Sequence, residues 1–560
     1  MKKFIPKHLA AAAIWLLIFT MAPHNGLAQK FESVKDEKNN KYILKVHFKL
    51  PPKAIDSARI TQPLVWEFHE RNAKNAATSY LRAHYYLTEH LRRNSQNNYH
   101  KLLTAIWEEA DNSPIGTEAL IRQTIKSPIP RSSNEQQGEE ITPEELRRQQ
   151  QNDFVRGISL AEQDYAVFSL REHPEQLDAV KNFVEQNEPL FRCLEEGSHC
   201  DLCDFGIPFR ETNNPIGLPL SDIQNMREVA RALRVKILLE IHEKRFNDAI
   251  KSIRVGLAMA RHTGKQPLLI CGLVGISIQN LMLQGLQEMM SDPDCPNFFW
   301  ETATIPHPFL NFSDAAEAEK NLLPQTLPLL RKAMDSPESI SDAEWRLLLQ
   351  QMLDFLIPFV DQQHTLAEFP YDLLKHSHQS FMISSYPAAR QWFLAQGKTA
   401  EEIDAMIIEK VIGLHAVYEL QRIGSEYYGG IYLPLWEKYE TDEWYLQWHG
   451  ETSLLLFSGN WFVNVPTKLL LPAINSARTA YRRMAMSSDI MRIAAAIQDY
   501  AAQHHGNVPA TLDEIKKLPI PFIDPTSGNA YDYKVVNGIG QIYVSQAMSS
   551  DFIIEFEIVK

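Results

Sequence analysis

Basic residues are the scarcer kind of charged residue in this 560-residue chain. It holds 56 lysines and arginines against 69 aspartates and glutamates, which gives a formal net charge of −13. An acidic balance opposes binding to the phosphate backbone of nucleic acids. No basic stretch interleaved with aromatic residues offsets it. We therefore do not expect nucleic acid as a partner.

The signatures of common catalytic centres are also missing. The chain has no H-E-x-x-H zinc motif, no G-x-S-x-G nucleophile turn and no G-x-x-x-x-G-K-[ST] phosphate loop. The sequence therefore indicates no catalytic residue, no cofactor and no metal site by motif.

Long apolar runs are lacking after the N-terminus. A helix that crosses a membrane needs about 20 mostly apolar residues. The most apolar later segments are 268–278, 352–360 and 454–471; the first two are too short, and polar residues interrupt the third. We predict that all three are buried core and that no stable transmembrane span is left once a signal is cleaved.

The N-terminus has the three parts of a cleavable secretory signal. Lys2, Lys3 and Lys7 are followed by the uncharged apolar stretch Leu9–Met21. The small-residue site Gly26-Leu27-Ala28 then predicts cleavage between Ala28 and Gln29. An uncleaved membrane anchor is the alternative. We expect export to the periplasm or cell envelope, or secretion, and no lipid anchor because no cysteine stands at the cleavage site.

Helix-start signals recur along the rest of the chain. Ser221 with Gln224, Ser341 with Glu344, and Thr399 with Glu402 each have the spacing of a capping box. Residues 221–264 also form two apolar stripes at helical spacing that resemble a tetratricopeptide-type helix pair. The sequence lacks a strict period, so a bundle and an irregular helical array both stay open. The expected class is mainly α.

The last 85 or so residues have a different pattern. A long helix is followed by three strand patterns, and Asn537-Gly538 predicts a hairpin turn between the first two strands. We predict a small α+β module, a long helix on a three-stranded antiparallel sheet. The expected organisation is a signal peptide (1–28), an N-terminal strand and helices (29–126), a linker or long loop (127–141), a helical domain (142–473) and the α+β module (474–560).

The C-terminal pattern resembles the globular domain of the major (G-type) pseudopilin of the general secretion pathway. The resemblance lies in Asn507-Val508-Pro509, Asp524-Pro525, Gly528-Asn529, Tyr531 and Tyr533. It implies a similar fold for about the last seventh of the chain. The methylated N-terminal phenylalanine, the long apolar helix that follows it and the acidic calcium loop of that family are all absent. The resemblance therefore does not imply polymerisation or calcium binding.

The remainder resembles a group of uncharacterised exported bacterial proteins that carry the same tail. The stretches that carry this resemblance include Cys203-Asp204-Phe205, Leu273-Val274-Gly275-Ile276 and Tyr386-Pro387-Ala388-Ala389. It implies export and a helical fold, but no activity.

Cysteine is rare, with five in the chain, and three lie close together as Cys193, Cys200 and Cys203. In an exported protein, a structural disulfide is the leading interpretation, because thiols are oxidised outside the cytoplasm. Cys203 would pair with Cys193 or Cys200, and Cys193 is preferred because closing a C-x-x-C pair requires a tight turn. A zinc site that includes His199 and a redox C-x-x-C pair are the two alternatives.

An aromatic-rich stretch, 427–462, is the remaining candidate for binding. Its helical spacing favours core packing, with partner or glycan binding as the alternative. We expect a non-enzymatic exported scaffold or protein-interaction protein whose partners are other envelope proteins. An envelope hydrolase acting on glycan or peptide, and an accessory of a secretion or pilus-like machine, are the alternatives.

Overall fold

The computed structural model describes residues 31–36, 41–56, 62–93, 170, 174–212, 215, 218, 220–362, 378–432, 461–516, 518–521, 523–525, 527–544 and 551–559. The expected cleavage site at Ala28 and Gln29, the expected linker 127–141 and most of the aromatic stretch 427–462 lie outside these residues. Within them the protein is mainly α-helical with a small sheet, as the sequence predicts.

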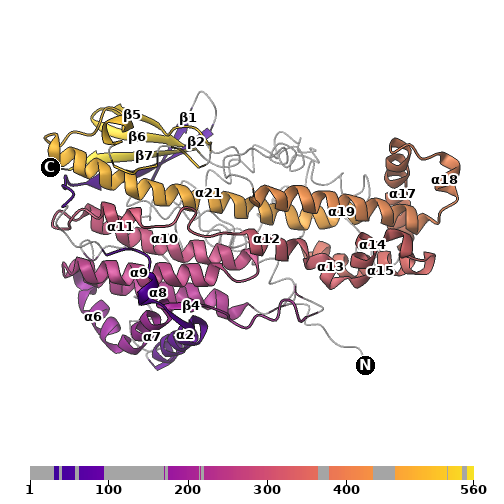
Figure 1. Ribbon diagram of the computed structural model, residues 1–560, viewed down its shortest axis with the longest axis horizontal. Helices are drawn as coiled ribbons and strands as arrows, with labels where there is room; N and C mark the ends of the chain where they lie inside the picture. Colours follow the sequence, from indigo (N-terminus) through magenta and orange to yellow (C-terminus); the bar gives the residue numbers. More distant parts are fainter. Residues whose placement is uncertain are drawn as a thin grey trace, which may run out of the picture.

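The first half of the chain contributes stacked helices and two pairs of strands. Its elements are β1 (Phe31–Asp36), β2 (Lys41–Leu50), η1 (Phe68–Glu70), β3 (Asn72–Asn75), α2 (Ala76–Arg93), η2 (Pro174–Gln176), α6 (Leu177–Gln186), α7 (Glu188–Ser198), β4 (Cys200–Leu202), α8 (Ser221–His242), α9 (Phe246–Gly264) and α10 (Leu269–Ser291). Figure 1 shows α21 and the large sheet on one side of the α8–α10 stack, and α2, α7 and β4 on the other.

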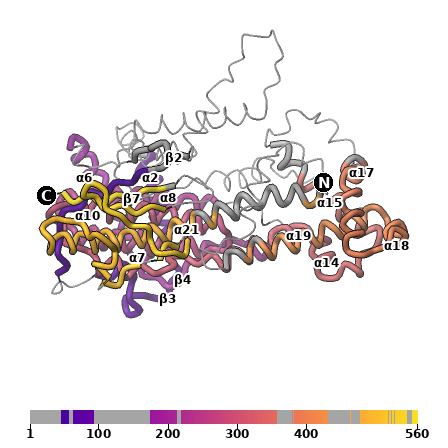
Figure 2. The backbone as a smooth tube through the Cα atoms, turned by 90° about the horizontal axis from the view of Figure 1, so that it is seen from above, coloured from indigo at the N-terminus to yellow at the C-terminus, as the bar shows by residue number. Residues whose placement is uncertain are grey.

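The second half extends the molecule and returns to the sheet. Its elements are α11 (Phe299–Ala303), α12 (Ser313–Lys320), α13 (Leu322–Thr326), α14 (Pro328–Asp335), η4 (Pro337–Ser339), α15 (Asp342–Gln362), α17 (His378–Ala395), α18 (Ala400–Asp404), α19 (Ile408–Tyr432), α21 (Trp461–Gln503), η6 (Leu512–Ile515), β5 (Asp532–Val536), β6 (Ile539–Val544) and β7 (Asp551–Ile558). The helices α14, α15, α17 and α18 gather at the end remote from the sheet, as Figures 1 and 2 both show.

Local capping chemistry accounts for two of the helix starts. The Ser341 hydroxyl accepts a hydrogen bond from the Glu344 amide (3.3 Å), and the Glu344 carboxylate accepts one from the Ser341 amide (2.9 Å). Thr399 and Glu402 form the same reciprocal pair. Both predicted boxes are therefore confirmed. The box predicted at Ser221 is wrong: α8 begins one residue earlier than a Ser221 cap requires, and Leu220 is its N-cap without a side-chain bond.

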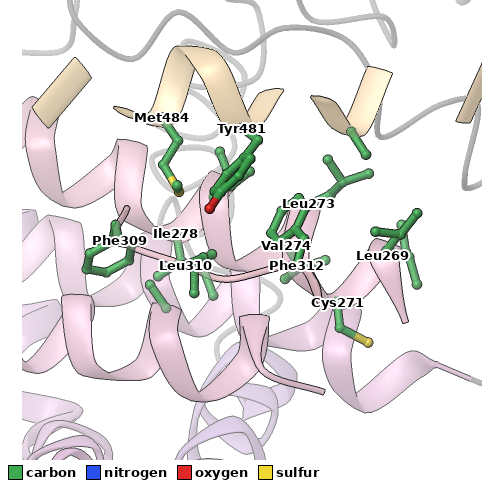
Figure 3. Close-up of a cluster of buried hydrophobic side chains, with 14 of the residues drawn as sticks. Leu269, Cys271, Leu273, Val274, Ile278, Phe309, Leu310, Phe312, Tyr481 and Met484 are labelled. Atoms are coloured by element: carbon green, nitrogen blue, oxygen red, sulfur yellow. The ribbon is translucent and has the colours of Figure 1, made fainter. Parts of the chain in front are cut away.

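The main core lies between α10, α21 and the segment that follows α11. In Figure 3, Phe312 lies between α10 and α21 and stacks on Tyr481 of α21 with ring centroids 4.9 Å apart, while Leu310 packs against Gly264 of α9 and Gly275 of α10. Gly272 leaves room for the Phe312 ring, because a Cβ there would lie 2.6 Å from it. By length and composition, α10 is the one helix in the described chain that could cross a membrane, but 89% of its most apolar window is buried in the fold. Residues 268–278 are thus core, as predicted.

The large sheet contains five strands in the order β1-β2-β7-β6-β5, not the expected three. The expected hairpin is present: β5 and β6 pair antiparallel, and Asn537 and Gly538 both have positive φ angles of 54° and 81°. The difference arises at the other edge of β7. There β2 pairs parallel with β7, from Ile43 opposite Asp551 to Leu50 opposite Ile558.

The segment after β2 ties the N-terminal strands to both long helices. The Lys53 amide donates to the Gln498 carbonyl of α21 (3.0 Å), and its ammonium donates to the Met290 carbonyl of α10 (2.8 Å). The Asn297 side-chain amide donates to the carbonyls of Lys53 (2.9 Å) and Ala495 (2.8 Å). Because these groups are buried, each bond satisfies a polar group that is out of reach of water. The core of the C-terminal segment therefore includes residues from the start of the chain.

Candidate functional site

The three clustered cysteines lie where α7 ends and β4 begins. Cys193 and Cys200 are buried and Cys203 is half-buried, and β4 pairs parallel with β3, with Cys200 opposite Asn72. All three are free thiols, as are the buried Cys271 and Cys295. The disulfide expected among Cys193, Cys200 and Cys203 is not formed in the structure and stays a prediction for the exported protein.

The backbone at β4 separates the two cysteines of the C-x-x-C pair. Residues 200–202 are extended, so three steps of about 3.3 Å place the Cα atoms of Cys200 and Cys203 up to roughly 10 Å apart. A disulfide requires a separation below about 7 Å. The Cys200 thiol instead donates to the Glu196 carbonyl at 3.5 Å. Burial raises the pKa of Cys193 and Cys200, and raises the pKa of Cys203 to about 12, so these thiols are not activated as nucleophiles.

His199 does not join the thiols as the expected zinc alternative requires. Its Nδ1 lies 2.8 Å from the Glu70 carbonyl, and its ring lies against Trp66 with centroids 3.8 Å apart. In the part of the chain that the structure describes, no three His, Cys, Asp or Glu side chains converge as a metal site would need.

A buried tyrosine–histidine pair that sequence reasoning missed lies beside the thiols. The Tyr80 hydroxyl and His262 Nδ1 are 2.8 Å apart, and Tyr80 is fully buried against Gly197. Burial lowers the pKa of His262 to about 4 and raises that of Tyr80. Both groups are therefore neutral at physiological pH, and the pair locks α2 onto α9 without a charge. The apolar stripe of α2, which includes Tyr80, is visible in the sequence, but His262, the partner of Tyr80, lies 182 residues away.

A braced turn next to the thiols presents apolar side chains to solvent. Trp66 lies under the Arg254 guanidinium (3.6 Å to the ring centroid) and contacts the His199 ring. Arg254 also forms an ion pair with Glu70, the last residue of η1. On this turn Phe68 is 82% exposed, and Leu202 of β4, opposite Asn75 of β3, is 60% exposed.

Arg71 connects the turn that carries Phe68 to β4. Its guanidinium lies 5.7 Å from the Phe68 ring centroid and 3.1 Å from the Asp201 carboxylate. Leu202 follows Asp201 in the chain. We call Phe68, Arg71 and Leu202 the Phe68 surface.

A second titratable cluster joins the helical body to the C-terminal sheet. Asp489 of α21 is 1% exposed; the Tyr531 hydroxyl donates to its Oδ2 (3.3 Å), and His307 Nδ1 lies 3.6 Å from its Oδ1. Burial raises the pKa of Asp489 to about 7, while burial and Arg492 lower the pKa of His307. Arg492 itself donates to the carbonyls of Thr302 and Ile305. The cluster brings together one proton-binding carboxyl and a histidine that reaches solvent.

Of the aromatic stretch 427–462, the structure describes residues 427–432 and 461–462. Tyr428 of α19 and Phe462 of α21 are both buried in the core, which agrees with the interpretation of this stretch as packing.

Comparison of the chain with protein-family models, with curated proteins and with solved structures finds no match in any of the three.

Proposed function

We propose that this protein is a non-enzymatic, exported protein of the cell envelope that binds another envelope protein through the Phe68 surface. The observation that carries the proposal is the 82% exposure of Phe68 on a turn held in place by buried contacts. Large exposed aromatic side chains are enriched among residues that dominate protein–protein binding energy.

The bracing of this turn supports the proposal because ordering a loop on binding reduces affinity. Glu67 and Glu70 form a capping box across η1. The Asn72 amide donates to the His199 carbonyl at 2.8 Å, and Arg254 anchors Glu70 from α9. Phe68 is thus presented by a backbone already fixed in one conformation.

One feature of the fold supports a scaffold role. The antiparallel pair α8 and α9 resembles a tetratricopeptide-type hairpin, with Ala249 and Ala260 as fully buried small residues.

The resemblance of the C-terminal segment to the pseudopilin globular domain supports the second candidate, an accessory of a secretion or pilus-like machine. The observation that favours it is the packing of α21 on β7 of the sheet, through Ile490, Ile493 and Ile497 on one side and Phe552, Ile554 and Phe556 on the other, all of which are buried.

Site-specific photocrosslinking in the native envelope tests the binding role. A photoreactive residue at Leu202 should give one dominant protein adduct, and Phe68→Asp should abolish it because a charge would replace the apolar anchor. Ile383→Asp is the matched control, since Ile383 is 74% exposed at the remote end of the molecule on α17. An adduct that survives Phe68→Asp, or equal loss with Ile383→Asp, would contradict the proposal.

A further inference from the structure

Two arginines lie on the face of α9 that braces the turn carrying Phe68, and among the described residues only one of them has an anionic partner. Arg254 and Arg261 are seven residues apart, which places them on one face of the helix about 10 Å from each other. Arg254 is matched by Glu70 and lies over Trp66. Arg261 has no ion-pair or hydrogen-bond partner among the described residues, and its Nε is buried without one.

The surroundings of Arg261 are cationic. Burial lowers the pKa of Arg261, and the charge of Arg71 acts in the same direction. Lys265 follows one turn later and contributes, with Arg261, to the low pKa of His262. Of the acidic residues in β4 and just after it, Asp201 pairs with Arg71, and the Asp204 carboxylate accepts from the Gly206 amide at 2.8 Å. A half-buried guanidinium without a counterion is unfavourable, because burial removes its hydration and supplies no opposite charge.

We propose that Arg261 binds an oxyanion, and that the docked partner supplies this oxyanion as a side-chain or C-terminal carboxylate. The planar guanidinium fork matches the two oxygens of a carboxylate or phosphate. The site lies on the face of α9 that carries Arg254, which braces the turn that presents Phe68. This inference rests on the proposed function for the source of the anion, but not for the binding of an anion as such.

The first experiment measures anion binding by the purified full chain without any partner. Inorganic phosphate, added against chloride at constant ionic strength, should raise the melting temperature of the wild type by about 2 °C as the site fills. Arg261→Gln should lose this increase and, in chloride, melt at the same or a higher temperature because an unmatched cation has been removed. Arg192→Gln is the control, since Arg192 is an exposed arginine already paired with Glu188 at 2.7 Å. An equal phosphate response in the wild type and Arg261→Gln overturns the site.

The second experiment identifies the source of the anion. With the photoreactive residue at Leu202, Arg261→Gln should reduce the partner adduct at least five-fold, and phosphate should compete with the adduct in the wild type only. An adduct that persists in Arg261→Gln, alongside a lost phosphate response, overturns the assignment to a partner carboxylate. Loss of the adduct in Phe68→Ala tests the proposed function separately, because that variant removes the aromatic anchor, adds no carboxylate and keeps Arg261 with its phosphate response.

Discussion

The buried Asp489 makes the stability of this protein depend on pH at the scale of one residue. Its pKa rises from 3.8 to about 7 on folding, so the folded state binds the proton more tightly than the unfolded state. The penalty for burying the charge is absent below about pH 4, grows as the pH rises, and is complete above pH 7.

Asp489→Asn should therefore stabilise the protein at pH 8 and change little at pH 4.5. We expect a gain of roughly 1–3 kcal/mol at the higher pH, because the amide cannot ionise but can still accept from Tyr531. Thermal melts of both proteins between pH 4.5 and 8 measure the difference. Asp354→Asn, at an exposed position of α15, is the control. A stability difference that does not vary with pH would contradict this account.

Two glycines of α19 should respond in opposite ways to the same substitution. A Cβ at Gly413 would lie 2.5 Å from the fully buried Trp345 ring, whereas one at Gly424 would meet only Lys320 Cγ at 3.9 Å. Gly413→Ala should destabilise the protein by about 1–3 kcal/mol through overpacking. Gly424→Ala should stabilise it by about 0.5–1 kcal/mol, because alanine loses less backbone entropy in a helix. Urea unfolding of the two variants would show the opposite signs, and equal effects would mean that α15 and α19 are packed differently.

At the scale of elements, the sequence predicts what is local and misses what is distant. The helices at 221–264 and the caps at Ser341 and Thr399 depend on residues a few positions apart, so their patterns are visible in the chain. The pairing of β2 with β7 joins residues more than 500 positions apart. The alternation of apolar and polar residues in either strand does not identify the strand with which it pairs. The candidate site follows the same rule. The three cysteines are recognisable by type, but the Tyr80–His262 and Asp489–His307 contacts arise from packing alone.

The parallel pairing of β2 and β7 predicts that the C-terminal sheet depends on the N-terminal strand. Phe48 is fully buried, with its ring centroid 5.5 Å from that of Phe556 on β7. Phe48→Ala should lower the free energy of unfolding by about 3–5 kcal/mol and increase hydrogen exchange in β7. Lys49→Ala, at the adjacent exposed position, should do neither. Unchanged exchange in β7 of Phe48→Ala would mean that residues 474–560 form their own core, as the sequence alone indicates.

The extended backbone of β4 bears on which cysteines pair after export. Because Cys200 and Cys203 lie at the ends of a stretched segment, we expect the Cys193–Cys203 disulfide, with Cys271 reduced in the core of α10. Peptide mapping of native protein under non-reducing conditions identifies the bond. Free thiols at Cys193, Cys200 and Cys203 together would end the disulfide hypothesis, and a Cys200–Cys203 bond would require β4 to unpair from β3.

At the scale of the whole molecule, the envelope partner and the disulfide both depend on export. A partner in the envelope and an oxidised cysteine pair both require the chain to leave the cytoplasm. Export is indicated by three lysines, an uncharged apolar stretch and the small-residue site that ends at Ala28. Gln29 would then be the first residue of the mature protein, two positions before Phe31, where β1 begins at the edge of the large sheet.

We predict that mass spectrometry of the native protein finds an N-terminus at Gln29 or within a few residues of it, in the periplasmic or secreted fraction. Cleavage at this point leaves β1 and its pairing with β2 intact. Replacing Ala28 with a bulky residue should block cleavage, because the processing site requires small side chains, and should leave the chain attached to the membrane through residues 9–21. Intact Met1 on protein recovered from the cytoplasm would refute export, and with it the envelope partner. Phosphate binding at Arg261 would be unaffected, because it depends only on the folded chain.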